Sequence, residues 1–229
     1  MDKIRLSARL QAVADFVPPE ARLADIGSDH AFLPAYLVQT GKINFAVAGE
    51  VVDGPFRIAK NHIESANLHN NIYVKKANGL DAIDVSEQID TVVIAGMGGI
   101  LIADILKTGQ EKLDSITRLI LQPNNHEDTL RHWLVENHFT IVAEQILLDA
   151  DKFYEIIVAE PESTNLTKLS KADFRFGPFL SREKSVIFRQ KWEKELSTLD
   201  KILLRLPEEQ AEKRFEMLKK QAEIKEVLS

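Results

Sequence analysis

The sequence predicts an α/β fold built on a mostly parallel β-sheet. Short apolar runs of strand length alternate with segments of helical periodicity through the first part of the chain. This alternation is typical of βαβ units, whose strands pair in parallel. Two consecutive strand-like segments follow, and beyond them the strand pattern ends. We therefore expect one seven-stranded sheet, closed by an antiparallel hairpin, and a helical C-terminal part.

Each predicted element follows from local spacing. Leu6, Leu10, Val13 and Val17 recur at helical intervals, and Pro18 and Pro19 end that helix. Five strands are predicted at residues 23–26, 45–48, 72–74, 90–95 and 119–121. Helices are predicted at residues 32–38, 55–66, 100–106 and 127–137. Residues 140–148 and 153–159, joined by residues 149–152, predict the closing hairpin.

Composition excludes several classes of protein. The 229 residues are 45% hydrophobic and 28% charged, which is ordinary for a folded globular protein and too apolar for disorder. The chain has no cysteine, which excludes a disulfide scaffold, a cysteine-ligated metal site and thiol catalysis. No apolar run approaches the roughly 18–20 residues of a membrane span, and residues 1–5 lack the apolar core of a signal peptide. We expect a cytoplasmic protein without membrane contact.

The C-terminal residues form a separate block. Residues 1–160 carry 14 basic and 23 acidic side chains, whereas residues 161–229 carry 15 and 12. We therefore divide the chain into a sheet domain, 1–160, and a C-terminal domain, 161–229. A nearly heptad apolar seam, broken by Pro207 and followed by a second helical pattern, predicts an α-helical coiled-coil hairpin. The seam comprises Phe188, Trp192, Leu196, Leu199, Leu203 and Leu206, and the second helix Ala211, Phe215, Leu218, Ala222 and Leu228. The basic balance suggests a polyanionic partner; the alternative is a solvated hairpin of mixed charge.

The turn after the first strand is the candidate ligand site. Ligands of open parallel sheets bind at the carboxyl ends of the strands. Gly27 follows the first strand directly and allows a tight turn with close backbone approach. Glu50 ends the second strand, 23 residues further on, where a carboxylate accepts hydrogen bonds from ribose hydroxyls. Turn, spacing and carboxylate together predict an adenosine-type ligand.

The charge of the turn favours one such ligand. Dinucleotide binding needs a Gly-x-Gly-x-x-Gly turn that admits a pyrophosphate, and this turn contains only Gly27. Asp29 would oppose a pyrophosphate as a like charge. S-adenosylmethionine has a sulfonium, an ammonium and no phosphate, so the electrostatics favour it over NAD.

Four motifs make the sequence resemble a known family. They are LSARL at residues 6–10, LADIGSDHAFLP at 23–34, AGMGG at 95–99 and LQPN at 121–124. In this order they resemble the bacterial tRNA (adenine-N1)-methyltransferases that act on the adenine at position 22. The resemblance covers essentially the whole chain. It implies a Rossmann-like class I methyltransferase domain, a C-terminal coiled coil, S-adenosylmethionine as cofactor and tRNA as partner.

The resemblance also implies roles for individual residues. The expected cofactor-binding residues are Asp25, Gly27, Ser28, Glu50, Asn78, Gly79 and Gly96. The expected substrate-binding residues are His30, Gly96, Met97, Gly98, Pro123 and Asn124. Asp29 is the candidate catalytic residue, because its carboxylate can accept a hydrogen bond from the adenine amine as N1 becomes alkylated. The alternatives are that Asp29 only shapes the turn or caps a helix, and that His30 contacts the cofactor carboxylate or simply packs.

Adenine N1 lies on the Watson–Crick edge, so we expect the target base to be flipped into the cleft. The basic residues considered for phosphate contacts are Arg5, Arg9, Lys75, Lys76, Arg182, Lys184, Arg189 and Lys191, with simple solvation as the alternative for each. The histidines show no metal-ligand spacing, and we expect no metal. We expect a monomer or a weak homodimer.

Two other functions stay open from the residues. One is a nicotinamide-dependent oxidoreductase on a similar sheet, which the missing glycines and Asp29 disfavour. The other is a non-catalytic nucleoside-binding assembly protein whose coiled coil mediates association.

Overall fold

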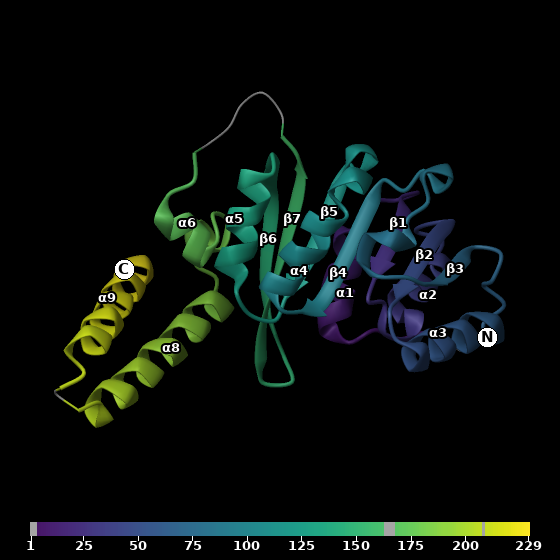
Figure 1. The fold of residues 1–229 in the computed structure, drawn as a ribbon. Coiled ribbons are helices and arrows are strands. Elements are labelled where there is room, and N and C mark those ends of the chain that lie inside the picture. Colours follow the sequence, from purple (N-terminus) through teal and green to yellow (C-terminus); the bar gives the residue numbers. More distant parts are fainter. Residues whose placement is uncertain (1–3, 163–167, 208) are drawn as a thin grey trace.

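A single seven-stranded sheet forms the centre of the protein in the computed structural model, which describes residues 4–162, 168–207 and 209–229 (Figure 1). The strand order is β3-β2-β1-β4-β5-β7-β6. The strands are β1 (Arg22–Ile26), β2 (Phe45–Glu50), β3 (Ile72–Lys76), β4 (Thr91–Met97), β5 (Arg118–Pro123), β6 (Phe139–Asp149) and β7 (Lys152–Pro161). The first five are parallel, and β7 is antiparallel to both β5 and β6. The predicted sheet and its closing hairpin are confirmed.

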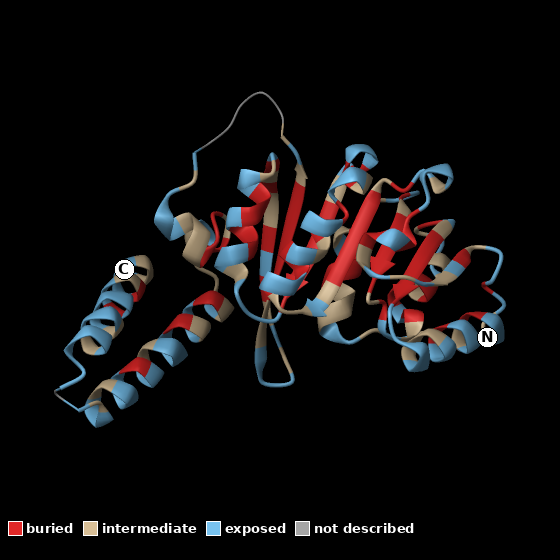
Figure 2. Ribbon diagram, in the orientation of Figure 1, coloured by how far each residue is buried: buried red, intermediate tan, exposed pale blue. Residues whose placement is uncertain are grey.

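Helices cover both faces of the sheet because successive strand residues point to opposite sides. Leu23 and Val93 pack in one core, while their neighbours Ala24 and Val92 pack in the other. The first core includes residues of α1 (Ala8–Phe16), α2 (Phe32–Gln39) and α3 (Asp53–Ser65), and the second includes residues of α4 (Gly99–Thr108) and α5 (Glu127–Glu136). Figure 2 shows the resulting band of buried residues along the strands.

The β6–β7 turn projects beyond the sheet at the edge where β4 ends (Figure 1). Its two central residues, Ala150 and Asp151, have φ angles of 46° and 62°. Left-handed values at both positions are typical of the tight turns that connect antiparallel strands. The hairpin therefore forms a wall beside the carboxyl ends of the parallel strands, which is where ligands bind in this class of sheet.

The C-terminal residues form α6 (Lys171–Phe176), α7 (Leu180–Glu183), α8 (Val186–Arg205) and α9 (Ala211–Leu228). The predicted link at residues 162–171 falls partly on residues 163–167, which lie outside the described part of the chain. Helices α8 and α9 are confirmed and lie as two arms joined at one end (Figure 1). Phe188, Trp192 and Leu199 of the predicted seam are buried. Coiled-coil geometry itself stays a prediction.

The predicted face of α9 is wrong over most of its length, although Leu228 packs against the core that contains Phe188 and Trp192. Phe215 is 70% exposed and Leu218 is 49% exposed, whereas Gln221 and Ile224 are buried. The reason is a polar residue inside the packed stripe: Gln221 Nε2 donates to Asp200 Oδ1 of α8 at 2.7 Å. A glutamine whose amide is hydrogen-bonded can be buried in a packed helix face. A pattern based on the spacing of apolar residues does not detect it.

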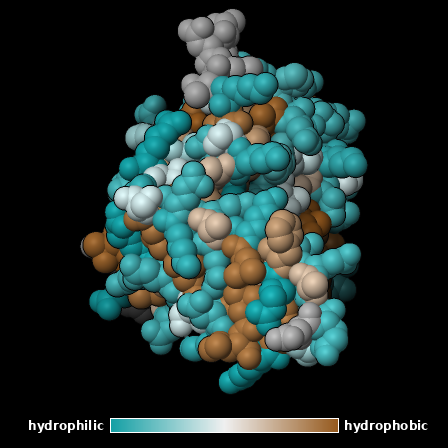
Figure 3. All heavy atoms as spheres, turned by 90° about the vertical axis from the view of Figure 1, so that its left-hand side faces the viewer, coloured by the Kyte–Doolittle hydropathy of each residue, from teal (hydrophilic) through white to brown (hydrophobic). Residues whose placement is uncertain are grey.

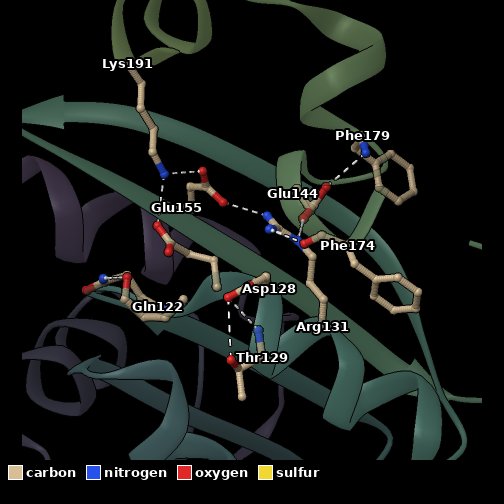
Figure 4. A network of polar contacts seen from close by, with 11 residues as sticks. Gln122, Asp128, Thr129, Arg131, Glu144, Glu155, Phe174, Phe179 and Lys191 are labelled. Carbon is tan, nitrogen blue, oxygen red and sulfur yellow. Dashed lines mark hydrogen bonds and ion pairs between the residues drawn. The ribbon is translucent and has the colours of Figure 1, made fainter. Parts of the chain in front are cut away.

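A buried ionic network attaches the C-terminal helices to the sheet (Figure 4). Arg131 of α5 has no exposed side-chain surface and donates to Glu144 Oε1 at 2.7 Å and to Glu155 Oε2 at 2.5 Å. Glu144 also accepts from the Phe179 amide at 2.9 Å, while Lys191 of α8 contacts Glu155 at 2.6 Å. Burial alone raises the pKa of Glu155, but Lys191 and Arg131 together hold it below its ordinary value. Burial raises the pKa of Glu144 despite Arg131, so the charged form is favoured at Glu155 and not at Glu144.

The surface on the side of the C-terminal helices is mostly hydrophilic with scattered apolar areas (Figure 3). In the described residues, no helix combines the length and apolar character needed to cross a membrane.

Candidate active site

The turn after β1 is held against the end of β2 by three backbone amides. The amides of Gly27 and Ser28 donate to the Gly49 carbonyl at 2.9 and 3.3 Å, and the Asp29 amide donates to Glu50 Oε1 at 2.7 Å. The φ angle of Gly27 is 69°, which glycine adopts without strain. The predicted neighbours Gly27 and Glu50 are thus joined through the intervening turn.

Left-handed backbone continues beyond the glycine. Asp29, His30 and Ala31 have φ angles of 40°, 66° and 57°. Such a run is uncommon for residues with side chains and is found where function or packing imposes it. The His30 carbonyl accepts a hydrogen bond from His62 Nδ1 at 2.7 Å, so that nitrogen carries the proton. This bond ties the turn to α3.

Three carboxyl groups surround the turn. Asp25 is 3% exposed, and burial raises its pKa to about 7, although a hydrogen bond from the Ser28 hydroxyl counteracts the shift. The negative charges of Glu50 and Asp29 raise that pKa further, and Arg9 lowers it. Burial also raises the pKa of Glu50. The turn therefore gathers three carboxyl groups, with Arg9 and His30 as the basic side chains near them.

This set of carboxyl groups fits S-adenosylmethionine. A sulfonium and an ammonium are favoured beside carboxylates, whereas a pyrophosphate is repelled. One oxygen of Glu50 accepts the Asp29 amide, and no donor among the described residues contacts the other, which leaves an acceptor for a ribose hydroxyl. Asn78 and Gly79 lie nearby, because the Ala77 amide donates to the Glu50 carbonyl at 3.0 Å. They line a small pocket of about 170 Å³ against Leu101 and Ile105 of α4.

The ends of β4 and β5 form a second wall, which we call the acceptor wall and define by Gly96, Met97, Gln122, Pro123 and Asn124. Asn124 Nδ2 donates to the Gly96 carbonyl at 2.7 Å, and its amide donates to the Met97 carbonyl at 2.7 Å. Gln122 is fully buried and accepts from the Gly96 amide at 3.1 Å. Pro123 is buried, whereas Asn124 is exposed. The predicted residues of the second wall are brought together.

Glycines let the backbone loops of this wall approach one another. A Cβ on Gly99 would lie 2.2 Å from the His126 carbonyl oxygen, and one on Gly98 would lie 2.9 Å from Asn125 Oδ1. Strand β4 extends to Met97, so Gly96 and Met97 end the strand rather than follow it as predicted. Their pairing with β5 is interrupted by a register shift between Ala95 and Met97.

Met97 connects the two walls. A Cβ built on Gly27 would lie 2.1 Å from Met97 Cε, so the methionine end packs directly over the first turn. Gly27 is therefore required both by its φ angle and by the contact with Met97.

Arg9 was considered in the sequence only for phosphate binding, and the structure places it at the acceptor wall. Its Nη1 donates to Gln122 Oε1 at 2.6 Å, its guanidinium lies 5.5 Å from the centre of the Tyr154 ring, and a Cβ on Gly96 would approach Nη1 to 3.4 Å. Arg9 belongs to α1, outside the alternating βαβ units, so strand-end reasoning gives no signal for it. The sequence predicts that residues 122–125 line this wall, but it does not single out the buried Gln122, which accepts from both Arg9 and Gly96.

Several of the basic residues considered for phosphate contacts are engaged elsewhere. Lys75 contacts Asp84 and Glu87, and Lys76 lies 2.6 Å from Asp53. Lys191 belongs to the buried network, and Arg189 donates to the Leu228 carbonyl at 2.9 Å. These four side chains therefore make contacts within the protein. Within the described residues, no three histidine, aspartate or glutamate side chains converge as a metal site would require.

Two sizeable hollows lie away from the first turn. A space of about 830 Å³ lies between α5, α6 and the two C-terminal helices, and one of about 640 Å³ lies between α8 and the β6–β7 turn. We place the chemistry at the strand ends, because the carboxylates, the glycine contacts and the acceptor wall converge there.

Comparison with known proteins identifies the same family. The profile of the family described as "tRNA (adenine(22)-N(1))-methyltransferase" matches residues 23–227. The tRNA (adenine(22)-N(1))-methyltransferase of Bacillus subtilis is 45% identical over 200 residues, covering 86% of this chain and 83% of that protein.

Solved structures agree. A putative tRNA (m1A22) methyltransferase from Streptococcus pneumoniae superposes with a TM-score of 0.95 at 51% identity, over 98% of this chain and 100% of that one. Its complex with S-adenosyl-L-methionine superposes with a TM-score of 0.91 at 50% identity, with the same coverage. The chain belongs to the tRNA (adenine(22)-N(1))-methyltransferase family.

Proposed function

We propose that this chain methylates N1 of adenine 22 in tRNA, with S-adenosylmethionine as donor and Asp29 as the residue that orients and stabilises the base. Family membership supports the reaction. The observation that carries the proposal is the placement of an acidic turn, Asp25 to Asp29, against the acceptor wall through Met97.

Each wall has its own task. The backbone turn at Gly27 and the carboxylate of Glu50 hold the cofactor, with Asp25, Ser28, Asn78 and Gly79 as further contacts. When bound, S-adenosylmethionine supplies an electrophilic methyl group on its sulfonium sulfur. Gly96, Met97, Gly98 and Asn124 hold the flipped adenine, with Pro123 supporting them from beneath, and His30 borders the base from the first turn.

Asp29 stabilises the positive charge that develops on the adenine and does not activate the nucleophile. Neutral adenine N1 already has a lone pair, so no base is needed to generate the nucleophile. Alkylation makes the ring cationic and its exocyclic amine more acidic. The Asp29 side chain is 81% exposed and so is available to accept a hydrogen bond from that amine. Most of the rate comes from holding two reactants in line.

The division of labour that we propose assigns the cofactor and the chemistry to residues 1–160, and RNA contacts beyond the cleft to residues 161–229. A tRNA substrate is consistent with the cytoplasmic location that we expect for this protein. The C-terminal helices are not independent of the sheet, because Ile146 of β6 packs in the same core as Phe188 and Trp192. Point substitutions therefore test this division better than truncation.

The direct test is product identification. The protein is incubated with unmodified tRNA and methyl-labelled S-adenosylmethionine, the RNA is digested, and the nucleosides are identified by mass spectrometry. We expect labelled 1-methyladenosine, lost when adenine 22 is replaced by guanine. Label in another nucleoside, or at another position, contradicts the proposal.

A further inference from the structure

A groove of about 640 Å³ runs from the acceptor wall between the β6–β7 turn and α8. We call it the flank groove and define it by Asn124, Asn125, Lys152, Phe153, Tyr154 and Lys194. We propose that the flank groove binds a nucleotide adjoining the target adenosine, with the Phe153 ring stacking on its base. The inference rests on the proposed function and adds a second nucleotide subsite to it.

The flank groove is continuous with the acceptor wall through Asn124. The exposed side chain of Asn124 donates to the Gly96 carbonyl at 2.7 Å and also lines the groove. A flipped base remains joined to its neighbours, so the RNA chain must leave the cleft across its rim. Asn124 and Asn125 mark where that rim opens into a space of the size that small ligands occupy.

Phe153 has the surroundings of a stacking residue rather than of a core residue. It is half-buried and belongs to none of the three hydrophobic cores formed by the described residues. Lys194 Nζ of α8 lies 5.5 Å from the centre of the Phe153 ring. An aromatic ring outside the core with a cation beside it is a recurring arrangement for binding unpaired nucleotides, whose bases stack and whose phosphates need a counter-charge.

The lysines of the groove differ in what they already contact. Lys191 is held by Glu127 at 2.9 Å and Glu155 at 2.6 Å. Lys152 and Lys194 form no ion pair within the described residues, because no carboxylate oxygen there lies within 4.0 Å of either ammonium nitrogen. Both are exposed and available for a phosphate.

Acidic side chains moderate that attraction. Asp151 and Glu195 also line the groove, so their charges balance those of Lys152 and Lys194. Charge alone therefore does not select the ligand, and the Phe153 stack carries most of the binding.

Contacts within the protein tie the walls of the groove together. Lys191 ties α8 to β7 next to Phe153, and the β6–β7 turn is a tight two-residue connection. A subsite whose walls are already positioned loses less conformational freedom on binding.

The test is steady-state methylation of tRNA by Phe153→Ala, Phe153→Trp and the matched control Tyr73→Ala. Tyr73 is an exposed aromatic residue on β3, at the opposite edge of the sheet. We expect Phe153→Ala to raise the KM for tRNA about tenfold, as the loss of one stacked base predicts, with kcat within about twofold. Phe153→Trp restores the KM, and Tyr73→Ala leaves it unchanged. The affinity for S-adenosylmethionine is the same in all variants.

A KM for Phe153→Ala within about twofold of the parent protein overturns the inference without touching the proposed function. A binding measurement separates the two further, because it needs no turnover. The nucleotides on either side of position 22 are replaced, one at a time, by fluorescent 2-aminopurine. We expect emission at one position to be quenched by the parent protein and by Tyr73→Ala, but not by Phe153→Ala. Equal quenching by Phe153→Ala, or none by the parent protein, also overturns the inference.

Discussion

Lys191 of α8 and Glu155 of β7 form an ion pair of 2.6 Å that joins the C-terminal helices to the sheet next to the candidate active site. Glu155 is 1% exposed, and its second oxygen contacts the fully buried Arg131. The same carboxylate thus connects α8, β7 and α5. Helix α5 begins shortly after the acceptor wall, so these contacts connect the C-terminal helices to the element that follows that wall.

Arg131→Met is predicted to destabilise the protein strongly. It leaves Glu144 buried without its charged partner and leaves Glu155 with Lys191 alone, and loss of one member of a buried pair costs about 3–5 kcal/mol. Arg118→Met is the matched control, because Arg118 pairs with Glu160 at 30% and 37% exposure and an exposed pair contributes about 1 kcal/mol at most. Urea unfolding of the two variants measures the difference, and equal losses would contradict the assigned role.

Two glycine-to-alanine changes are predicted to have opposite effects. In Gly99→Ala the new Cβ meets the His126 carbonyl oxygen at 2.2 Å, so the loop behind the acceptor wall must move and methylation should fall at least tenfold. In Gly54→Ala the Cβ meets nothing within 4 Å on α3, and helix propensity should stabilise the protein by up to about 1 kcal/mol. Thermal unfolding and a methylation assay on both variants check this. Parent-like methylation by Gly99→Ala would contradict the prediction.

Glu50→Gln is predicted to weaken S-adenosylmethionine binding by about tenfold or more. The substitution keeps the size of the side chain but removes a charged acceptor, and hydrogen bonds to charged groups contribute about 1.5–3 kcal/mol. Calorimetric titration measures the affinity, with exposed Glu20→Gln as control. Parent-like affinity in Glu50→Gln would remove this carboxylate from the cofactor site.

Asp25 is predicted to make stability fall as the pH rises toward neutrality. Its folded pKa of about 7 exceeds the ordinary 3.8, so between these values the folded protein keeps a proton that the unfolded chain has lost. The free energy of unfolding therefore decreases from about pH 4 to pH 7, by at most about 1.4 kcal/mol per pH unit from this group, and levels off above. Denaturant unfolding of the parent protein and of Asp25→Asn across this range isolates the contribution. An unchanged slope in Asp25→Asn would show that Asp25 does not carry it.

How much of the fold and of the candidate site can be predicted from the sequence depends on how far apart in the chain the interacting residues lie. Buried strands such as 23–26 and 119–121 are bounded by turn residues and were placed within two residues of their observed ends. The Gly27 turn and Glu50 were predictable because strand order places the carboxyl ends of β1 and β2 together. Arg9 reaches Gln122 across 113 positions, a contact that no local pattern encodes. The face of α9 was wrong because Gln221 is buried through a partner on another helix.

The most direct measurement of the central claim is the single-turnover rate of methyl transfer by Asp29→Asn, together with its affinity for S-adenosylmethionine. Asparagine keeps the size of the side chain but not the charge that is proposed to stabilise the alkylated adenine. We predict an affinity within a few-fold of the parent protein and a rate lower by about 100-fold or more. A parent-like rate, with adenine 22 still methylated, would contradict the role assigned to Asp29.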